Sequence, residues 1–246
     1  MKNKFTIAIA VFTFWISVWW IFALIINDSY LLPSPYETLS ALLNLLTLGS
    51  FYKVVLMTFL RVLCGLLSGV AIGTLLAFSA YRIGFMRSLI SPIISIIKAM
   101  PVATFILLLW LTLRGSMLTV FIGFIMVMPI IFQNVLAGLD ALDNNLKEVA
   151  KVFELTTLQK LRILFFPSIR SYLFPAIITS VGLAFKSQIA AEIIAYTNNS
   201  IGQYIYDANY GLNTDVVFAW ATVIVVFSIS LESLCRLILG RIKNEA

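Results

Sequence analysis

The chain has 246 residues, of which 61% are hydrophobic and 11% are charged, and its formal net charge is +6. Soluble domains average roughly 45–50% apolar and 25% charged residues, so this composition excludes a soluble globule, a disordered chain and a disulfide scaffold. Long continuous apolar runs favour transmembrane helices over a β-barrel, whose strands alternate apolar and polar residues. We therefore expect an all-α, polytopic membrane protein.

Several kinds of chemistry are excluded by what the sequence lacks. It contains no histidine, which excludes histidine-based acid–base and metal sites. It also contains no G-x-x-x-x-G-K-[ST] motif, so the chain has no Walker-type nucleotide site. We expect no catalytic residues, no metal and no cofactor, and any ATP that drives this protein would be bound by another subunit.

The first apolar run ends at Ile26 and is preceded by Lys2 and Lys4. A bilayer is spanned by about 20 apolar residues, so the run is long enough to cross it. A signal peptide is the alternative, but the run is rich in tryptophan and has no small-x-small cleavage site. We interpret residues 1–30 as a retained first transmembrane helix.

Residues 31–50 form a loop with a helix start signal. Ser34 is followed by Pro35 and, three residues after the serine, by Glu37, which is the pattern of a capping box with proline in the first turn. Leucines then recur at helical spacing, at Leu39, Leu42, Leu43 and Leu46. This predicts a short amphipathic helix that lies along the outer membrane surface as a packing and anchoring element.

Five further spans are predicted, at about 54–80, 88–113, 117–135, 172–196 and 216–238. With six spans, the basic residues fall almost entirely on one side, and only Lys53 and Arg114 lie on the other. The positive-inside rule then places both termini in the cytoplasm. The basic residues on that side are Lys2, Lys4, Arg82, Arg87, Lys147, Lys151, Lys160, Arg162, Arg170, Arg241 and Lys243. Residues 1–246 are thus expected to form a single transmembrane domain in the cell (inner) membrane.

Small residues mark one face of the second span, where Gly65, Gly69 and Gly73 make two consecutive G-x-x-x-G steps. In lipid, such residues let two helix backbones approach closely. The spacing fits packing within the chain and a dimer contact equally well. The third and fourth spans are predicted to be broken by prolines, at Pro92, Pro101 and Pro129.

The segment 136–171 is long and charged, which is unusual in a chain with otherwise short loops. Its apolar residues predict a first short helix with Leu146, Val149, Ala150 and Phe153 on one face. Thr156 and Gln159 form a capping box that opens a second helix, which Pro167 is predicted to end. An amphipathic hairpin of this kind fits docking into a groove on a soluble partner, and an interfacial position on lipid headgroups is the alternative.

Ionisable residues inside spans are costly, by about 2.5–3.5 kcal/mol each on insertion scales, and are candidates for function. At about 1.5 Å per residue, Arg61 and Glu192 lie within roughly 10 Å of the outer interface, and Lys186 lies near mid-membrane. Glu192 would pair with Arg61 or Lys186 to hold helices together. In the alternative, Lys186 and Gln188 would line a path and ease passage of an anion, although Gln188 shares a helix face with Glu192 rather than with Lys186.

The hairpin also resembles a known family. Glu148-Val149-Ala150, with Leu164, Phe166 and Pro167 at the end, is similar to the E-A-A-x3-G-x9-I-x-L-P motif of permease subunits of binding-protein-dependent ABC importers. The departure is Glu154, which stands where the family has glycine. Glycine suits a left-handed turn, where glutamate would cost roughly 1 kcal/mol, so either the turn has a different shape here or the strain is accepted.

Other segments carry the same resemblance over about residues 30–240. They are Leu32-Pro33-Ser34-Pro35, Thr58-x-x-Arg61-x-x-x-Gly65, the prolines Pro92 and Pro101, the segment from Gly182 to Glu192, and Ser200-Ile201-Gly202. The segment from Gly182 to Glu192 and the Ile201-Gly202 pair resemble the nitrate/sulfonate/taurine-type branch of the family.

The resemblance implies a type I ABC importer permease fold, with the permease core at 51–240. It implies cytoplasmic ABC ATPase subunits, an extracytoplasmic solute-binding protein and a second permease copy, most simply a homodimer, as partners in the lipid bilayer, and no nucleic acid. The hairpin would couple the permease to the ATPase through Glu148, Val149, Ala150, Phe153, Glu154, Thr156, Leu164, Phe166 and Pro167.

Two other classes compete with this interpretation. A secondary transporter would need no docking hairpin, and inverted repeats would be expected. A membrane-embedded enzyme would need a nucleophile–base pair, and none is evident. The transported solute cannot be read from the sequence.

Overall fold

The computed structural model describes residues 2–245, and side chains except those of residues 2–5, 8 and 241–245. Helices are the regular secondary structure of the described part, joined by short turns and loops, and none of its residues is in a strand. The helices are α1 (Lys2–Ile26), α2 (Pro35–Thr47), α3 (Gly49–Arg82), α4 (Gly84–Ala99), α5 (Val102–Trp110), α6 (Gly115–Asp140), α7 (Asn144–Val152), α8 (Thr157–Gln159), the π-helix η1 (Lys160–Phe165), α9 (Phe166–Ile194), α10 (Ile201–Tyr210) and α11 (Thr214–Glu245).

Five segments are long and apolar enough to cross a membrane, namely those containing α1, α3, α6, α9 and α11. The pair α4 and α5 passes the same test together but is bent by 102° at its break, and it gives a sixth span if both halves count as one. Each predicted span thus has a helical counterpart. Most of these helices extend several residues beyond the predicted bounds, because helical structure continues past the apolar core into the polar flanks.

Only one of the three prolines breaks its span. Pro101 separates α4 from α5, and Met100 before it is extended, with φ −80° and ψ 136°, as expected for a residue that precedes proline. Pro92 and Pro129 lie inside the continuous helices α4 and α6, so the predicted breaks at these two positions are wrong. Within membrane helices, neighbouring groups and small local adjustments can satisfy the carbonyl that proline leaves free.

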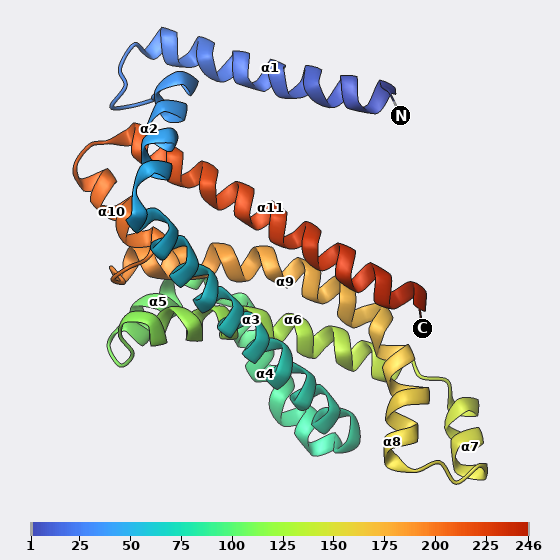
Figure 1. Ribbon diagram of the computed structural model, residues 1–246. Helices are drawn as coiled ribbons and strands as arrows, with labels where there is room; N and C mark the ends of the chain where they lie inside the picture. The colour runs from blue at the N-terminus through green and yellow to red at the C-terminus, as the bar shows by residue number, and fades with distance from the viewer. Residues whose placement is uncertain (1, 246) are drawn as a thin grey trace.

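The start of α1 and the end of α11 lie on the same side of the molecule. Figure 1 shows them at one end together with the α3–α4 junction and the α7–α8 segment, with α2, α5 and α10 at the other end. This agrees with an even number of crossings. By the positive-inside rule the α7–α8 end faces the cytoplasm, because Arg82, Lys147 and Lys160 lie there. The predicted contributions of Lys2, Lys4, Arg241 and Lys243 rest on side chains outside the described residues.

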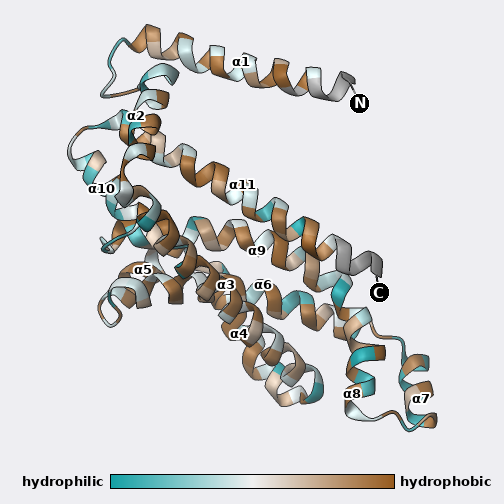
Figure 2. Cartoon of the chain, viewed as in Figure 1, coloured by the Kyte–Doolittle hydropathy of each residue, from teal (hydrophilic) through white to brown (hydrophobic). Residues whose placement is uncertain are grey.

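The core is formed by α3, α6 and α9. Its largest cluster of buried residues includes Val62, Val127, Ile131 and Phe185. A Cβ atom added at Gly69 or Gly73 would collide with α6, at Val127 or at the Met128 carbonyl. The glycine face therefore packs on α6 of the same chain and is not available as a dimer contact. Figure 2 shows that hydrophobic residues cover most of the long helices, whereas hydrophilic ones gather around α8 and α10.

The outer helix α2 begins as predicted and buries a different face. Ser34 accepts a hydrogen bond from the Glu37 N–H, and the Glu37 carboxylate accepts one from the Ser34 N–H, which confirms the capping box. Thr38, Ala41 and Leu45 are the buried residues, whereas Leu39, Leu43 and Leu46 are exposed. Three of the four predicted leucines therefore point away from the chain's own core, whereas Leu42 is partly buried against the cluster that contains Ala41 and Leu45. Figure 1 shows α2 running across the direction of α1 and α11.

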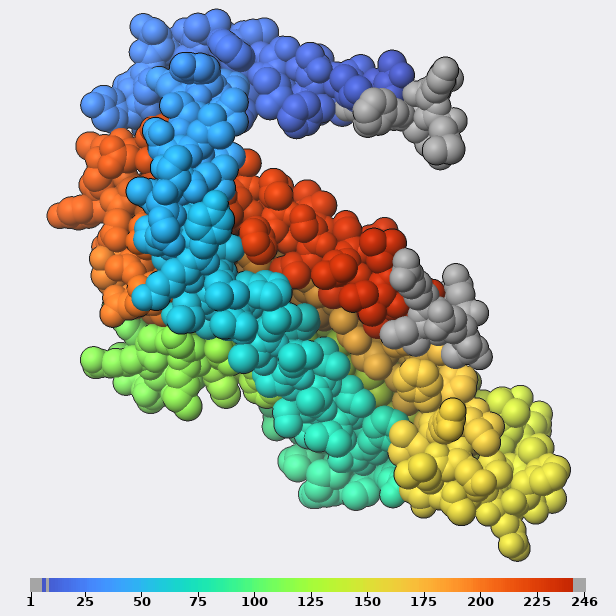
Figure 3. Space-filling model, viewed as in Figure 1, coloured from blue at the N-terminus to red at the C-terminus, as the bar shows by residue number. Residues whose placement is uncertain are grey.

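The first helix is attached to the remainder of the chain at its C-terminal half. The Trp19 indole N–H donates to the Pro33 carbonyl at 3.0 Å, and its ring stacks on Phe218 with 5.7 Å between centroids. Figure 3 shows α1 projecting from the molecule with open space between it and α11. Most of its side chains are exposed.

Candidate functional site

The loop at the cytoplasmic end folds into the α7–α8 hairpin (residues 143–165) because both of its helices have side-chain caps. The Asp143 side chain accepts from the Asn145 N–H at 2.9 Å and starts α7. The Thr156 hydroxyl accepts from the Gln159 N–H at 3.4 Å, and Gln159 Oε1 accepts from the Thr156 N–H at 2.8 Å. The predicted second capping box is thereby confirmed. Such caps satisfy backbone donors that have no partner inside the helix.

The turn between the two helices is left-handed at Glu154, where φ is 49°. The Leu155 N–H donates to the Ala150 carbonyl at 3.1 Å, which is the long bond of a Schellman motif. Of the two outcomes left open by the sequence, the chain therefore adopts the strained turn. A non-glycine residue in this conformation costs roughly 1–2 kcal/mol.

The second helix does not end at Pro167, contrary to the sequence-based prediction. After α8 the chain continues through the π-helix η1 directly into α9, with Pro167 in the first turn of α9. The wider π turn that precedes it leaves room for the proline ring next to the preceding carbonyls. The hairpin is thus joined to a membrane span by continuous helix.

The apolar face of α7 divides into an internal support and an exposed surface. Ala150 is buried against Leu142 and Leu164, with Leu155 and Phe165 beside them. Phe153, in contrast, is 73% exposed, and Leu158 on the opposing helix is 82% exposed. The other exposed apolar residues of the hairpin are Leu146, Val149, Val152, Leu161 and Ile163. Glu148 and Glu154 are exposed next to them, and Phe166 lies at the base of α9 in edge contact with Phe174.

A buried polar cluster lies at the opposite end, around the Glu192 carboxylate, which is fully buried. Oε1 lies 3.1 Å from Arg61 Nη1, and the Thr58 hydroxyl is 3.0 Å from each carboxylate oxygen. The backbone N–H of Gly202, in the first turn of α10, donates to Oε2 at 3.2 Å. Of the two partners considered from the sequence, Glu192 is paired with Arg61.

The Arg61 guanidinium also fixes the connection between α9 and α10. It donates to the carbonyls of Asn198 and Asn199 at 3.1 and 3.2 Å, and its Nε donates to the Ser116 hydroxyl at 2.9 Å. One side chain on α3 thereby joins the start of α6, the end of α9 and the start of α10. Every nitrogen of the guanidinium thus donates at least one hydrogen bond within its own chain, which suits the side chain to holding helices together.

Gln188 belongs to this core and not to a cavity wall. It is fully buried, and its Nε2 donates to the Arg61 carbonyl at 3.1 Å. A Cβ atom at Gly65 or Gly123 would collide with that amide nitrogen. Because these two glycines of α3 and α6 have no side chain, the glutamine side chain fits between the two helices. The prediction that Gln188 lines a path with Lys186 is wrong, because the two residues lie on different faces of α9.

Lys186 is exposed and makes no hydrogen bond or ion pair with the side chains that the structure describes. It shares an exposed face of α9 with Thr179, Gly182 and Leu183, and a Cβ atom on Gly182 would meet nothing within 4 Å. This face, which we call the Lys186 face, is not covered by the chain's own helices.

The structure reveals polar contacts between α4 and α6 that the sequence reasoning missed. Lys98 Nζ donates to Gln133 Oε1 at 2.6 Å, and the Arg87 guanidinium makes two bonds to the Asp140 carboxylate, at 3.1 and 2.9 Å. A cavity of about 270 Å³ lies beside them, lined also by Ser91 and Ser95. Lys98 is an ionisable residue inside a predicted span, so the criterion that singled out Arg61 would have found it.

Comparison with known proteins finds a matching family and several relatives. Residues 69–244 match the family described as "Binding-protein-dependent transport system inner membrane component". The chain is 26% identical over 155 residues to the nitrate import permease protein NrtB of Leptolyngbya laminosa, covering 62% of this chain and 54% of that protein. It is 23% identical over 229 residues to the putative aliphatic sulfonates transport permease protein SsuC of Bacillus subtilis (strain 168), covering 91% and 81%.

A second NrtB, from Synechococcus elongatus, is 26% identical and is covered over 49% of its length, so the chain spans about half the length of the two NrtB relatives. Among solved structures, the MetNI methionine ABC transporter in inward-facing conformations matches with a TM-score of 0.58 at 19% identity, over 79% of this chain and 93% of the matched one. An amino acid ABC transporter matches with a TM-score of 0.57 at 18% identity, over 80% and 94%. These two matches establish the fold.

Proposed function

Because the chain belongs to the family of binding-protein-dependent transport system inner membrane components, we propose that it is the permease subunit of an ATP-driven importer. The helices form a translocation path across the cell membrane, and an extracytoplasmic binding protein delivers the solute to the α2–α10 end. ATP is bound and hydrolysed by cytoplasmic ABC ATPase subunits, which move the permease between two states by binding them with different affinity.

The observation that carries this proposal is the exposed apolar surface of the α7–α8 hairpin. Val152, Phe153 and Leu158 are each at least 73% exposed, and clustered apolar residues of this kind mark interaction sites. Behind them Ala150 and Leu164 are buried, so the surface stands on a rigid support. The continuous helix from α8 through η1 into α9 gives the docked partner a mechanical connection to a membrane span.

A second copy of the chain completes the path in this proposal. The Lys186 face of α9 is apolar or small apart from the lysine, and burying it against another permease subunit places a cation at the path. An isolated charge at membrane depth is costly unless it faces a bundle interior or a water-filled cavity. A homodimer satisfies this requirement for both copies.

The solute in this proposal is a small anion. NrtB is named for nitrate and SsuC for aliphatic sulfonates, and both solutes are anions at neutral pH. Lys186 makes no ion pair with the described side chains and lies on a face that the chain leaves uncovered, whereas each guanidinium nitrogen of Arg61 already donates to a group of the same chain. In this proposal, the positive charge of Lys186 attracts the anion and eases its passage along the path.

Substitution of Phe153 tests the docking surface directly. The Phe153→Ser chain should insert and fold normally, since the side chain is 73% exposed, but should lose co-purification with the ATPase subunits and solute uptake. Tyr210→Ser is the matched control for co-purification, because Tyr210 is a similarly exposed aromatic residue at the end opposite to the hairpin and should leave ATPase binding intact. ATPase retention by Phe153→Ser, or full uptake by the chain with no ATPase partner, would contradict the proposal and favour a secondary transporter.

Lys186→Ala tests the path separately. We expect uptake of an anionic solute to fall while membrane insertion and ATPase binding are unchanged, because the side chain makes no ion pair with the described residues. Unchanged uptake would remove Lys186 from the path and leave the hairpin result untouched.

A further inference from the structure

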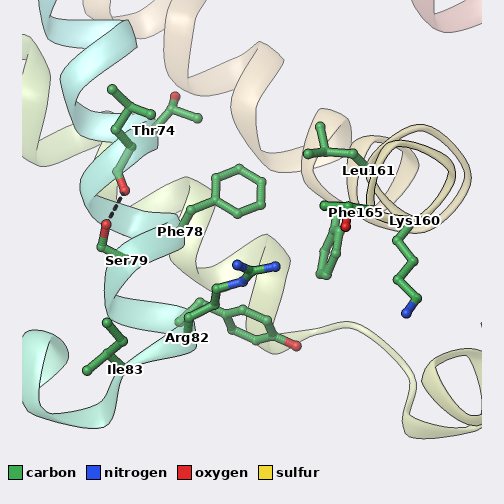
Figure 4. A pocket seen from close by; sticks show the side chains of 11 residues that line it. Thr74, Phe78, Ser79, Arg82, Ile83, Lys160, Leu161 and Phe165 are labelled. Atoms are coloured by element: carbon green, nitrogen blue, oxygen red, sulfur yellow. Dashed lines mark hydrogen bonds between the residues drawn. The ribbon is translucent and has the colours of Figure 1, made fainter. Parts of the chain in front are cut away.

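A cavity of about 610 Å³ lies between the cytoplasmic end of α3 and the α8–η1 segment of the hairpin. Figure 4 shows Phe78, Arg82 and Ile83 on one side and Lys160, Leu161 and Phe165 on the other, with the Arg82 guanidinium pointing into the space between the two helices. The volume is in the range of about 300–1,000 Å³ that is typical of small-molecule sites. The proposed transport function assigns no role to it.

The walls of this cavity are mostly apolar and are fixed by aromatic contacts. The ring of Phe165 makes edge contacts with Phe78 and Tyr81, with centroid separations of 5.9 and 6.2 Å. These contacts hold η1 against α3 and form one side of the cavity. Leu75, Ile83 and Leu161 line the remainder, and all three are at least half exposed. The cavity therefore offers apolar surface that the chain itself does not cover.

Its charged residues are all basic. Arg82 and Lys160 line the cavity, and none of its described lining residues is acidic. Neither side chain makes an ion pair among the described residues. A third cation is close by, since Lys147 Nζ lies 5.6 Å from the centroid of the Tyr81 ring. The mouth of the cavity thus has an unbalanced positive charge above apolar walls, which suits a ligand with an anionic head and an apolar body.

The position of the cavity identifies the source of such a ligand. It lies where two membrane-crossing segments, Gly49–Arg82 and Thr157–Ile194, reach their cytoplasmic ends. We infer that this end of α3, where the contacts of Phe78 and Tyr81 with Phe165 lie, is near the level at which lipid headgroups meet the hydrocarbon region. Basic pockets between helices on this side of a membrane bind anionic headgroups, and long basic side chains reach the interface while their stems remain in apolar surroundings.

We propose that this cavity is a binding site for an anionic phospholipid of the cytoplasmic leaflet. Arg82 and Lys160 contact the phosphate, and the acyl chains lie against Leu75, Phe78, Ile83 and Leu161. The bound lipid fills the space between α3 and the hairpin and braces the hairpin against a membrane span. The assignment does not depend on which solute is transported or on ATP coupling.

Native mass spectrometry of the full chain, released from nanodiscs containing equal amounts of phosphatidylglycerol and phosphatidylcholine, tests the proposal. The wild-type chain should retain phosphatidylglycerol preferentially. Arg82→Gln/Lys160→Gln should reduce that preference by about tenfold or more, because each basic side chain near the headgroups contributes to the attraction. Lys151→Gln/Arg162→Gln is the matched control, since it removes two basic charges from the same end of the molecule without touching the lining residues.

Each alternative result overturns the assignment. Equal retention of both lipids by the wild-type chain would exclude an anion-selective site, and this measurement needs no variant to fold. An equal loss in the control would show a general charge effect of the hairpin. Loss of the retained lipid when the ATPase subunits are bound would show that a protein segment occupies the cavity instead.

Discussion

The two ends of the molecule differ in whether their conspicuous residues have partners within the chain. Around Glu192, every charged group lies within hydrogen-bonding distance of a partner in the same chain, and the carboxylate is fully buried. On the α7–α8 hairpin, the apolar residues Phe153 and Leu158 are left in the open. The first arrangement is complete in one chain, whereas the second is completed only by a partner. Whether the residues find their partners within the chain thus distinguishes a structural cluster from an interaction surface, although both contain residues that the sequence singles out.

The largest expected effect is the loss of stability when the hydrogen-bonded cluster around Glu192 is disrupted. Arg61→Ala leaves the Glu192 carboxylate buried without its ion partner, and losing one partner of a buried pair costs about 3–5 kcal/mol. Thermal unfolding of the purified chain in detergent measures this loss. The double variant Arg61→Leu/Glu192→Met should recover part of it, because an apolar pair leaves no buried charge.

The exposed pair between Arg87 and Asp140 gives the matched control. Both side chains are substantially exposed, so Arg87→Gln should cost no more than about 1 kcal/mol. If Arg87→Gln and Arg61→Ala lowered stability equally, burial would not be what makes the Glu192 cluster structural.

The second effect tests the close packing that admits Gln188. Gly65→Ala places a methyl group against the Gln188 amide, and overpacking of this kind costs about 1–3 kcal/mol. Gly182→Ala meets nothing within 4 Å and should be neutral or stabilising by up to about 1 kcal/mol, because alanine favours helix. Equal unfolding midpoints for the two variants would show that Gln188 can move aside freely.

The third effect concerns the strained turn of the hairpin. Glu154→Gly relieves the positive φ and should stabilise the hairpin by about 1 kcal/mol. Hydrogen-exchange protection of the α7 amides measures this, because a hairpin can open locally while the membrane core stays folded. Glu148→Gly is the control inside α7, where glycine should weaken the helix by a similar amount. A loss of protection in both variants would contradict the strain at Glu154.

The smallest effect is the pH dependence of α2. The Ser29 hydroxyl and the Ser34 N–H and hydroxyl donate to the Glu37 carboxylate and hold its pKa below the ordinary 4.5. The resulting stabilisation is present above the ordinary pKa and is lost as the pH falls through the lower pKa of the folded chain. It should amount to a few tenths of a kcal/mol, because the carboxylate is largely solvated.

Hydrogen-exchange protection factors of the α2 amides, compared between neutral pH and about pH 3, measure this small loss. The Glu37→Gln chain should lose the pH dependence. A rise in α2 protection on acidification would contradict the lowered pKa.

The features predicted correctly from the sequence are those set by neighbours within a turn or two. The capping boxes at Ser34 and Thr156 depend on a side chain three residues away, and the spans depend on continuous apolar runs. The break at Pro101 likewise follows from the restricted conformation of the residue before proline. The predicted helix breaks at Pro92 and Pro129 and the predicted helix end at Pro167 are wrong, because local sequence does not show whether the surrounding helix can tolerate the missing hydrogen bond.

The candidate site was predicted less completely, because its roles depend on which faces of the helices meet. Helical spacing placed Ala150 and Phe153 on one face, and only the contact of Ala150 with Leu164 makes one a support and the other a surface. In the same way, the polar contact of Lys98 depends on Gln133, which lies on a different helix.

By itself, the sequence determined that this chain crosses a membrane several times, where its spans lie, which side is basic and that a capped hairpin interrupts the spans. These properties follow from hydropathy, charge and hydrogen bonds over a few residues. The tertiary structure decided that Glu192 pairs with Arg61, 131 positions away, that the glycines of α3 face α6 and that Lys186 is left uncovered. Such pairings arise from helix packing, because a small rotation of a helix about its axis changes which of its faces is buried and which is exposed.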